Sequence, residues 1–591
     1  MEKSPSVYKD RVLAWSVYSN GKRLDDSHEL ISASIRLELN RIGMATLKFN
    51  AGDLDKQVFP ETDAACFKPG STIRFDAGDV NHQDTLFEGI VTEVGIRAGR
   101  GERAHMVVEC RDCAYPATQG RKNRIFEKKK DSEMIKEALS DYGSVKADAT
   151  AYQHPEMVQY YCTDWDFALS RADACGLFIC VKGKEIMAIK PKVSSSPVLT
   201  VTCGLDMIAF DGSLSGGEQF ARYSGISWDP SQQKQVKIAS AAPALNKQGD
   251  LQPGDIACGG DLLLQTDAPI EGDALKEWVN SMALKAGLSR YQGSFSFYGS
   301  PEVEPGCLIA LKGLGKRFNG NVFIGSVHHS IENNEWVTEA GIGVRPSMIT
   351  EEPDVASPPG AGFLPGLEGL HTGVVTQLHD DPRQECRIRV ELPWMDGSKK
   401  ALWARFSSPY ATAAAGGLFL PEKGDEVLVG FINHDPCHPV VLGSLYGKKH
   451  QPPFGFEQDN DIKTVTTREK LELKFDEKQK TIILHTPGKN TVEINDEKKS
   501  IRLCDEHKNE ICMDKDGISL SSAKDIFLKA KGDIVAKACS KAEISANSDI
   551  VITGTNVKAS AKVSFTIKGN ASTELSASGQ TVIKGAMVMI N

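Results

Sequence analysis

Residues 481–513 read TIILHTPGKNTVEINDEKKSIRLCDEHKNEICM. Pairs of apolar residues recur in this stretch about every 8 to 10 residues, with one polar residue inside each pair; they are Ile482/Leu484, Val492/Ile494 and Ile501/Leu503. Alternation with period two is typical of a β-strand that has one apolar face. The short spacing leaves room for one strand and one turn per repeat. The repeat therefore presents a narrow apolar edge, and nothing in its own sequence covers that edge.

The same pattern extends over residues 460–591, from Leu471/Leu473 to Val588/Ile590. A repeat that cannot bury its apolar edge alone must stack its coils within one chain or wind together with other chains. A single-chain solenoid usually needs about 20 or more residues per coil. The shorter step favours an intertwined multi-chain prism, in which each chain supplies one side of each layer. A meander of antiparallel hairpins and a single-chain solenoid are the alternatives; a meander would want stronger turn signals and more aromatic residues.

Two β-rich regions and a linker precede the repeat. Short strands are predicted at 373–378, 386–392, 401–406, 417–420, 426–432 and 440–445, which indicates a small closed barrel. Prolines alternate with glycines in 351–370, a composition typical of a connector. Further upstream, alternating strands are interrupted by helices predicted at 132–142, 164–175 and 273–286. We therefore expect a mainly β protein with domains 1–347, 370–447 and 448–591 and a Pro/Gly linker over 348–369.

The composition disfavours several classes of protein. The 591 residues include 69 Lys and Arg against 78 Asp and Glu, a formal net charge of -9, whereas a protein that grips a phosphate backbone is usually basic. No apolar run approaches the ~20 residues of a spanning helix, and the N-terminus lacks an apolar signal core of ~7–15 residues. Fourteen scattered cysteines suit a reducing compartment. We expect a chain made in the cytoplasm, without a cleaved signal and without nucleic acid as its main partner.

Motifs for catalysis or metal binding are weak in this sequence. Cys110 and Cys113 form a CxxC without a second pair, and the HDPCH segment 434–438 is better explained by an Asp-Pro turn. His328-His329 is interpreted as a solvated strand end, Asp380-Asp381 as turn residues, and the basic stretch 121–130 as a solvated face or a subunit contact. There is no phosphate-binding GxxxxGK[ST], no GxSxG and no HExxH. We expect no catalytic, cofactor-binding or metal-binding residues, although a glycosidase-like carboxylate pair stays open.

The run PEKGDEVLVGFINHDPCHPVVLGSLYG, residues 421–447, closely resembles the barrel signature of VgrG proteins, the tip spikes of type VI secretion systems. Upstream, Gly373, Arg387 and Trp403 fit the first strands of that barrel. The segment from Gln159 to Phe167 is similar to the family's Gln-Tyr…Asp-Trp-Asp-Phe motif. The sequence departs from the family in lacking a strict Val-x-Gly octad in the repeat. It also has no room for the lysozyme domain that a related phage spike carries between barrel and prism.

The resemblance implies a fold similar to a phage tail hub fused to a central spike: a two-barrel hub domain, an oligonucleotide/oligosaccharide-binding (OB) type barrel and a triple-stranded β-prism or β-helix in a homotrimer. It implies a non-enzymatic spike that punctures target envelopes. The implied partners are an Hcp-like tube protein at the hub end, baseplate proteins, effectors with their adaptors, a PAAR-type cone protein and, transiently, the target membrane. The cone protein is expected on Gly585, Met587, Val588, Met589, Ile590 and Asn591. The protein would assemble in the cytoplasm and enter the target cell on firing. A phage-tail-like or extracellular injection particle, and a spike-borne wall hydrolase, are the alternatives.

Overall fold

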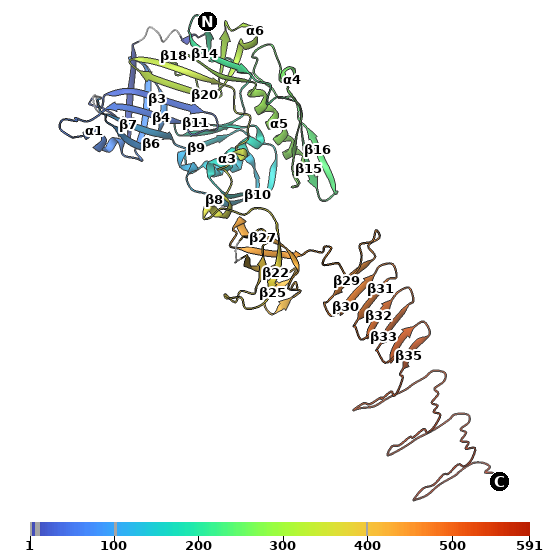
Figure 1. Ribbon diagram of the computed structural model, residues 1–591. Coiled ribbons are helices and arrows are strands. Elements are labelled where there is room, and N and C mark those ends of the chain that lie inside the picture. The colour runs from blue at the N-terminus through green and yellow to red at the C-terminus, as the bar shows by residue number, and fades with distance from the viewer. Residues whose placement is uncertain (1–2, 6–11, 26, 100–102, 397–399, 591) are drawn as a thin grey trace. The chain divides into compact units, whose positions relative to one another are not determined.

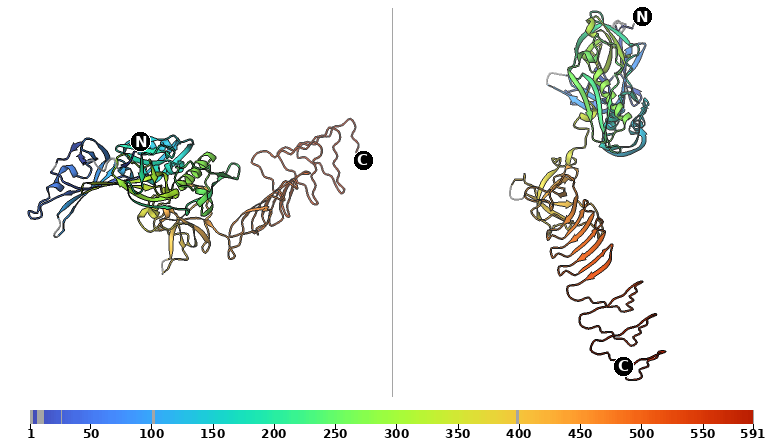
Figure 2. Two further views of the ribbon diagram at one scale, coloured as in Figure 1. Left: turned by 90° about the horizontal axis from the view of Figure 1, so that it is seen from above. Right: turned by 90° about the vertical axis from the view of Figure 1, so that its right-hand side faces the viewer.

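The computed structural model describes residues 3–5, 12–25, 27–99, 103–396 and 400–590. The chain divides into two compact units, Met1–Leu445 and Tyr446–Asn591. Strands dominate the first unit and the first part of the second, and all helices among the described residues belong to the first unit (Figures 1 and 2). The mainly β fold expected from the sequence is confirmed. Among the described residues, no helix has the length and apolar character needed to span a membrane.

A thirteen-stranded sheet forms the framework of the first unit. Its strands are β1 (Leu13–Ser19), β2 (Lys22–Arg23), β3 (Leu30–Glu38), β4 (Met44–Asn50), β5 (Thr72–Asp79), β6 (Gln83–Arg97), β7 (His105–Asp112), β13 (Leu199–Thr202), β14 (Met207–Leu214), β18 (Tyr291–Tyr298), β19 (Leu308–Lys312), β20 (Gly320–Glu332) and β21 (Glu335–Ile342). One apolar core surrounds Phe49 and Phe75, and a second surrounds Phe295. Pairing of β20 with β3, with Val327 opposite Leu37, joins the two halves. The predicted pair of barrels thus takes the form of two cores linked by one continuous sheet.

The three predicted helices are confirmed, as α2 (Asp131–Leu139), α3 (Asp164–Cys175) and α5 (Gly272–Leu288). Helix α3 begins where the Thr163 hydroxyl accepts the backbone N–H of Asp166, and it ends at Gly176 in the left-handed region, φ 68°. Three small sheets pack with these helices. They comprise β8 (Lys122–Lys130) with β10 (Gln153–Cys162); β9 (Ser144–Ala147), β11 (Phe178–Lys182) and β12 (Glu185–Ile189); and β15 (Phe220–Asp229), β16 (Lys234–Ala239) and β17 (Gly259–Gln265). The short helices are α1 (Pro60–Asp63), α4 (Pro253–Ile256) and α6 (Gly315–Phe318).

A five-stranded closed barrel lies at the end of the first unit. It consists of β22 (His371–Gln377), β23 (Arg387–Glu391), β24 (Ala401–Phe406), β27 (Glu426–Phe431) and β28 (Pro439–Ser444). Alternate valines such as Val375, Val390 and Val427 fill its interior. The strand predicted at 417–420 is wrong. A two-residue hairpin, β25 (Ala411–Thr412) with β26 (Ala415–Gly416), precedes it, and the apolar side chains after that hairpin are exposed.

The second unit begins with a seven-stranded antiparallel sheet in which each strand pairs with the next along the chain. Its strands are β29 (Ile462–Thr466), β30 (Glu472–Asp476), β31 (Thr481–His485), β32 (Thr491–Asn495), β33 (Ser500–Cys504), β34 (Glu510–Asp514) and β35 (Gly517–Ser521). Pairing within one chain is what the meander alternative predicted. The described residues 522–590 that follow contain neither helix nor strand, and nearly all are exposed. This last part of the chain buries almost nothing against itself.

Candidate functional site: an uncovered apolar face

The seven-stranded sheet gathers the apolar residues of the repeat on one of its faces. Register places Leu473, Leu484 and Val492 directly opposite one another in one row, and Phe475, Ile482 and Ile494 in a second row. Both rows continue across β33, β34 and β35. We call this set the apolar face; it consists of Leu473, Phe475, Ile482, Leu484, Val492, Ile494, Ile501, Leu503, Ile511, Met513, Ile518 and Leu520.

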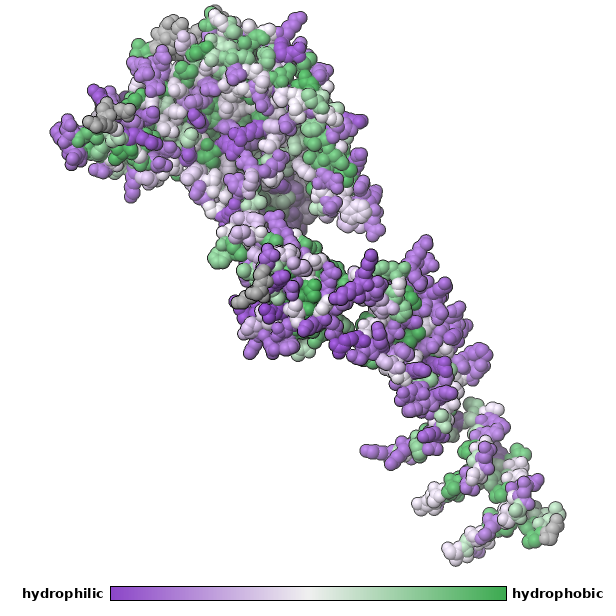
Figure 3. Space-filling model, in the orientation of Figure 1, coloured by the Kyte–Doolittle hydropathy of each residue, from purple (hydrophilic) through white to green (hydrophobic). Residues whose placement is uncertain are grey.

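The apolar face is not covered by its own chain. Exposed fractions are 41% for Ile482, 49% for Leu484 and 73% for Ile518. The row that includes Leu484 lines a groove of about 840 Å³. Figure 3 shows hydrophobic side chains among the hydrophilic ones of this unit. Soluble monomers rarely expose a contiguous apolar patch of this kind, so the face is a candidate interaction site.

The turns that connect these strands repeatedly use lysine in the left-handed backbone region. The positions are Lys470, Lys480, Lys489, Lys499 and Lys508, with φ between 48° and 68°. Glycine usually takes such positions because a Cβ atom is strained there. At these five positions the turns therefore lack the glycine signal by which hairpins are recognised in a sequence, which is one reason why the meander was the disfavoured alternative.

The residues expected to bind a cone protein lie in the part of the second unit without strands. Met587 is 79% exposed, Met589 85% and Ile590 90%, and Val588 is half exposed. Asn591 lies outside the described residues. A Cβ atom at Gly585 would lie 3.2 Å from the Met587 carbonyl oxygen, so this glycine allows a close turn. The side chains are accessible to a partner, and their docking role stays a prediction.

The basic stretch 121–130 has an internal role that the sequence did not reveal. Asp164 is fully buried, and its carboxylate accepts hydrogen bonds from Lys122 Nζ at 2.7 Å, Arg124 Nη2 at 3.2 Å, and the Tyr142 hydroxyl at 2.8 Å. Gln159 Nε2 donates a fourth at 2.9 Å. Burial alone would raise the pKa of Asp164, but these hydrogen bonds hold it below its ordinary value. The segment from Gln159 to Phe167 that resembles the family motif thus supplies two members of one hydrogen-bonded cluster, Gln159 and Asp164.

Arg121 fastens the linker to the first unit. Its guanidinium donates to the backbone carbonyl oxygens of Asp354 at 2.6 Å, Val355 at 3.3 Å and Ala356 at 3.0 Å. A fourth hydrogen bond goes to the Tyr161 carbonyl at 3.0 Å. Arg121 therefore holds residues 354–356 against β10, and the residues before them have contacts of their own, since Met348 is buried and Ile349 packs against the core that includes Leu169.

The cysteine and histidine motifs have structural surroundings. Burial raises the pKa of both Cys110 and Cys113 to about 12, which keeps these thiols protonated and unsuited to redox or metal chemistry. At the HDPCH segment, Asp435 accepts the backbone N–H of Cys437 at 2.8 Å and lies 2.9 Å from the His438 ring. These contacts are those of the predicted Asp-Pro turn.

The interpretation of His328-His329 as a solvated strand end is wrong. Strand β20 continues to Glu332 because it pairs there with both β3 and β21. His329 is only 2% exposed, its Nδ1 lies 2.9 Å from the Thr338 hydroxyl, and burial lowers its pKa to about 3. It is a neutral core residue. Asp381, by contrast, is a turn residue as predicted: it accepts hydrogen bonds from Arg387, which lower its pKa.

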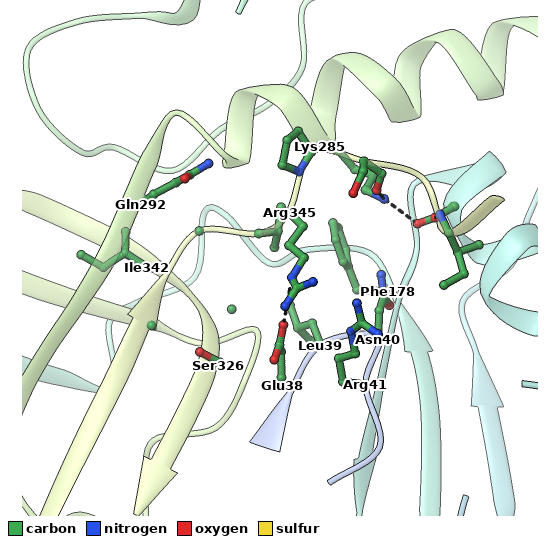
Figure 4. Close-up of a pocket in the computed structure, with 18 of the residues that line it drawn as sticks. Glu38, Leu39, Asn40, Arg41, Phe178, Lys285, Gln292, Ser326, Ile342 and Arg345 are labelled. Carbon is green, nitrogen blue, oxygen red and sulfur yellow. Dashed lines mark hydrogen bonds and ion pairs between the residues drawn. The ribbon is translucent and has the colours of Figure 1, made fainter. Parts of the chain in front are cut away.

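A pocket of about 350 Å³ lies where β3, β11, α3 and α5 meet the segment that follows β21 (Figure 4). Lys285 Nζ, almost fully buried, donates to Asp173 Oδ1 at 2.9 Å and to the Ser347 carbonyl at 2.6 Å. Arg345 Nε lies 3.7 Å from Glu38 Oε1, and Figure 4 shows the two side chains pointing toward each other. Arg41 pairs with Glu352 at 2.7 Å. Each of the three cations has a carboxylate partner, so the pocket is a structural junction rather than an anion site.

Two family models match this chain. Residues 9–333 match the model described as the Alg8 N-terminal domain. Residues 371–446, which include the closed barrel, match the model described as the type VI secretion system/phage-baseplate injector OB domain.

Curated relatives are spike proteins of type VI secretion systems. The chain is 24% identical over 403 residues to spike protein VgrG1b of Pseudomonas aeruginosa, covering 62% of this chain and 52% of the relative. It is 34% identical over 121 residues to VgrG5 of the same organism, covering 18% of this chain and 15% of the relative. The chain thus spans about half the length, or less, of these relatives.

Two solved structures show similarity to this chain. One is a 43 kDa prophage tail protein from Shewanella oneidensis, with a TM-score of 0.44 and 12% identity, covering 56% of this chain and 98% of that one. The other is a type VI secretion component from Escherichia coli, similar to bacteriophage T4 tail proteins gp27 and gp5. Its TM-score is 0.37 at 14% identity, over 73% of this chain and 99% of that one.

Proposed function

Because this chain belongs to the VgrG family of spike proteins, with residues 9–333 in the family described as the Alg8 N-terminal domain, we propose that it is a homotrimeric, non-enzymatic spike at the tip of a contractile injection apparatus. One observation carries the proposal: the apolar face of the second unit has nothing from its own chain to cover it. A rigid rod needs that face buried, and other copies of the same chain offer an identical face.

Three antiparallel sheets would form the prism, one from each chain, with the apolar faces turned toward the common axis. Burial of apolar area contributes about 25 cal/mol per Å², and obligate interfaces bury roughly 2,000 Å² or more. Residues 522–590, which form no strand within the chain, would pair with the other two copies and complete the rod. Such pairing would leave no free sheet edge along the shaft.

Partners follow from the place of such a spike in the apparatus. The first unit would sit on an Hcp-like tube protein and baseplate proteins. Exposed Met587, Met589 and Ile590, with Gly585, Val588 and Asn591, would hold a PAAR-type cone protein. Effectors and their adaptors would travel on the assembled spike. The protein would assemble in the cytoplasm and contact the target membrane only while it is driven into the target cell.

An enzymatic role of the first unit is the alternative raised by the match to the Alg8 model. Across the described residues, the pKa of two carboxyl groups is raised, those of Asp112 and Asp166. Asp112 accepts the backbone N–H groups of Gly43 and Ala114, and Asp166 accepts the Thr163 hydroxyl at a helix start. Both carboxyl groups are used to hold local structure, which favours a structural role. Zymography on peptidoglycan would detect a wall hydrolase.

The test of the proposal is the mass of the full chain by light scattering, beside a chain that ends near Gly447. We expect a particle of three times 64.2 kDa for the full chain, and a weaker or absent trimer without the second unit. A monomeric full chain would contradict the spike function, because the apolar face would then have no partner.

A further inference from the structure

The closed barrel has an apolar outer surface where β27 pairs with β22 and β28. In β27 and β28 the buried valines Val427, Val429 and Val441 alternate with residues that face outward. The central outward residues of these two strands, together with Leu370 just before β22, lie outside the barrel core. We call this set the barrel face; it consists of Leu370, Leu428, Gly430, Val440 and Leu442.

A notch lies at the centre of the barrel face. Gly430 has no side chain, and a Cβ atom there would lie 3.5 Å from Leu370 Cδ2 and 3.6 Å from Leu442 Cδ1. Apart from its chain neighbours, no other described residue comes within 4 Å of that position. Leu370 is 60% exposed and Leu442 48%, so the described part of the chain leaves both flanks of the notch open. An apolar side chain from outside would make ordinary van der Waals contact with both leucines.

A second exposed apolar group lies on the loop between β24 and β27. Leu418 is 80% exposed, Phe419 70% and Leu420 39%, and we call residues 418–420 the apolar loop. The start of this loop is held in place, because the Gly417 backbone N–H donates to the Tyr410 carbonyl oxygen at 2.9 Å. Apolar side chains that an ordered backbone holds in water are stabilised when a partner covers them.

We propose that the apolar loop of one copy packs into the barrel face of a second copy. This inference rests on the proposed trimer. Each copy carries one apolar loop and one barrel face, so the contact uses different surfaces of its two members. Three such contacts close into a ring around a threefold axis. In that ring every apolar loop and every barrel face is covered.

A second copy fits the barrel face because the trimer supplies it at high local concentration. Chains held together through residues 462–521 keep their barrels on tethers of residues 446–461, which extend to at most roughly 55 Å. Flexible tethers of such lengths give effective concentrations of about millimolar. A contact between barrels that is too weak to form between separate chains therefore forms once the second units associate.

The outer surface of the other barrel strands suits the apolar loop less well. Ile388, Val390 and Ala404 are buried in the barrel core, which places Arg387, Arg389 and Arg405 on the outside of β23 and β24. Covering guanidinium groups with apolar side chains removes water from them without replacing its hydrogen bonds. The apolar loop therefore favours the barrel face over the rest of the barrel.

The experiment is disulfide crosslinking of the full-length protein with Leu418→Cys and Leu442→Cys in the same chain. Both positions are well exposed, so the substitutions leave the barrel core intact. Mild oxidation should join two and three chains on a non-reducing gel, at least ~10-fold above either single substitution, because a disulfide needs Cβ atoms within about 4.5 Å. The single substitutions also measure the background from exposed native cysteines such as Cys437.

Two further variants test the specificity of the crosslink. Leu418→Cys with Glu391→Cys is the matched control, because Glu391 lies on β23, which pairs with β22 and β24 and not with β27 or β28. This pair should give only the background yield. Phe419→Asp, added to the Leu418→Cys and Leu442→Cys pair, should lower the yield at least ~10-fold, because it puts a carboxylate into the apolar contact. An unchanged yield would refute the apolar loop as the group that binds.

Light scattering of the same samples separates this inference from the spike proposal. A trimer without crosslinks would overturn the contact between barrels and leave the spike standing; the barrel face would then be free for a different protein. A monomer would overturn both. A disulfide that closes within one chain would also overturn the contact, because the apolar loop would then reach the barrel face of its own copy.

Discussion

Leu484→Asp should dissociate the assembly. Leu484 lies in the middle of the apolar face, with Leu473 and Val492 directly opposite on the two neighbouring strands. Fully burying a leucine contributes about 1.5–3 kcal/mol, and the 49% that the single chain leaves exposed corresponds to about 1 kcal/mol per copy. Three copies lose about 3 kcal/mol, and each new carboxylate costs further free energy when it is taken from water into apolar surroundings. The trimer should weaken by more than ~10³-fold in its dissociation constant.

The matched control is Ile483→Asp, one residue away in the same strand. Ile483 lies on the opposite face, with Lys474 and Glu493 as its cross-strand neighbours. Sedimentation velocity over a range of protein concentrations measures the mass of both variants. We expect trimers for Ile483→Asp and monomers for Leu484→Asp. Equal behaviour of the two variants, or a trimer with Leu484→Asp, would refute the assignment of the buried face.

Further predictions concern the lysine turns, the hydrogen-bonded cluster around Asp164, the linker 348–369 and the residues expected to bind a cone protein. Lys480→Gly should stabilise the second unit by up to ~1 kcal/mol in thermal unfolding, because Lys480 has φ 48°; Lys478→Gly, at an ordinary turn position, should not. Asp164→Ala should destabilise the first unit by ~3 kcal/mol, since it leaves Lys122 and Arg124 without their counterion. In the unaltered protein the pKa of Asp164 is lower in the folded state than in the unfolded state. The stability that Asp164 contributes is therefore complete above the unfolded pKa of about 3.9 and is lost as pH falls through the folded pKa. Urea titrations from pH 6 downward measure this loss, and Asp164→Ala should lack the part of it that comes from Asp164. Arg121→Ala should speed protease cleavage within 348–369 by releasing three linker carbonyls, with no change in the melting temperature of the second unit. Met587→Asp should abolish binding of a PAAR-type cone protein in a pull-down while the trimer mass stays the same; retained binding would exclude this residue from the docking surface.

Local pattern predicted the elements well where it was unambiguous. Helix α3 was predicted to the residue because Thr163 and Gly176 mark both of its ends. The barrel strands were predicted because alternation and turn residues agree. The strand predicted at 417–420 failed for a physical reason: Leu418 and Phe419 are apolar, but they are exposed and have no ladder partner. Apolar composition indicates a strand only when something packs on it.

The contacts that sequence reasoning missed are all long-range. Lys122 and Arg124 are about 40 residues from Asp164, and Lys285 is 112 residues from Asp173. A basic stretch appears solvated in a sequence because nothing local shows which buried acid it neutralises.

In the proposed spike, the prism and the meander, set against each other as alternatives, would describe different contacts: the meander describes hydrogen bonds within one chain, and the prism describes burial between chains. Hydrogen bonds between neighbouring strands of 462–521 close within one chain, over turns of a few residues, so this sheet can form locally. Its apolar face is then complete but uncovered by the rest of the chain. The described residues 522–590 form no strand within the chain, and almost none of them is buried. A period-two pattern with a step of 8 to 10 residues specifies strand and turn in both parts, but it does not specify which chain supplies the next strand. Left-handed lysine turns join most strands of the first part, and the described residues 522–590 contain neither such a turn nor a strand. In the proposed spike the second part would therefore depend on the other copies for its strands.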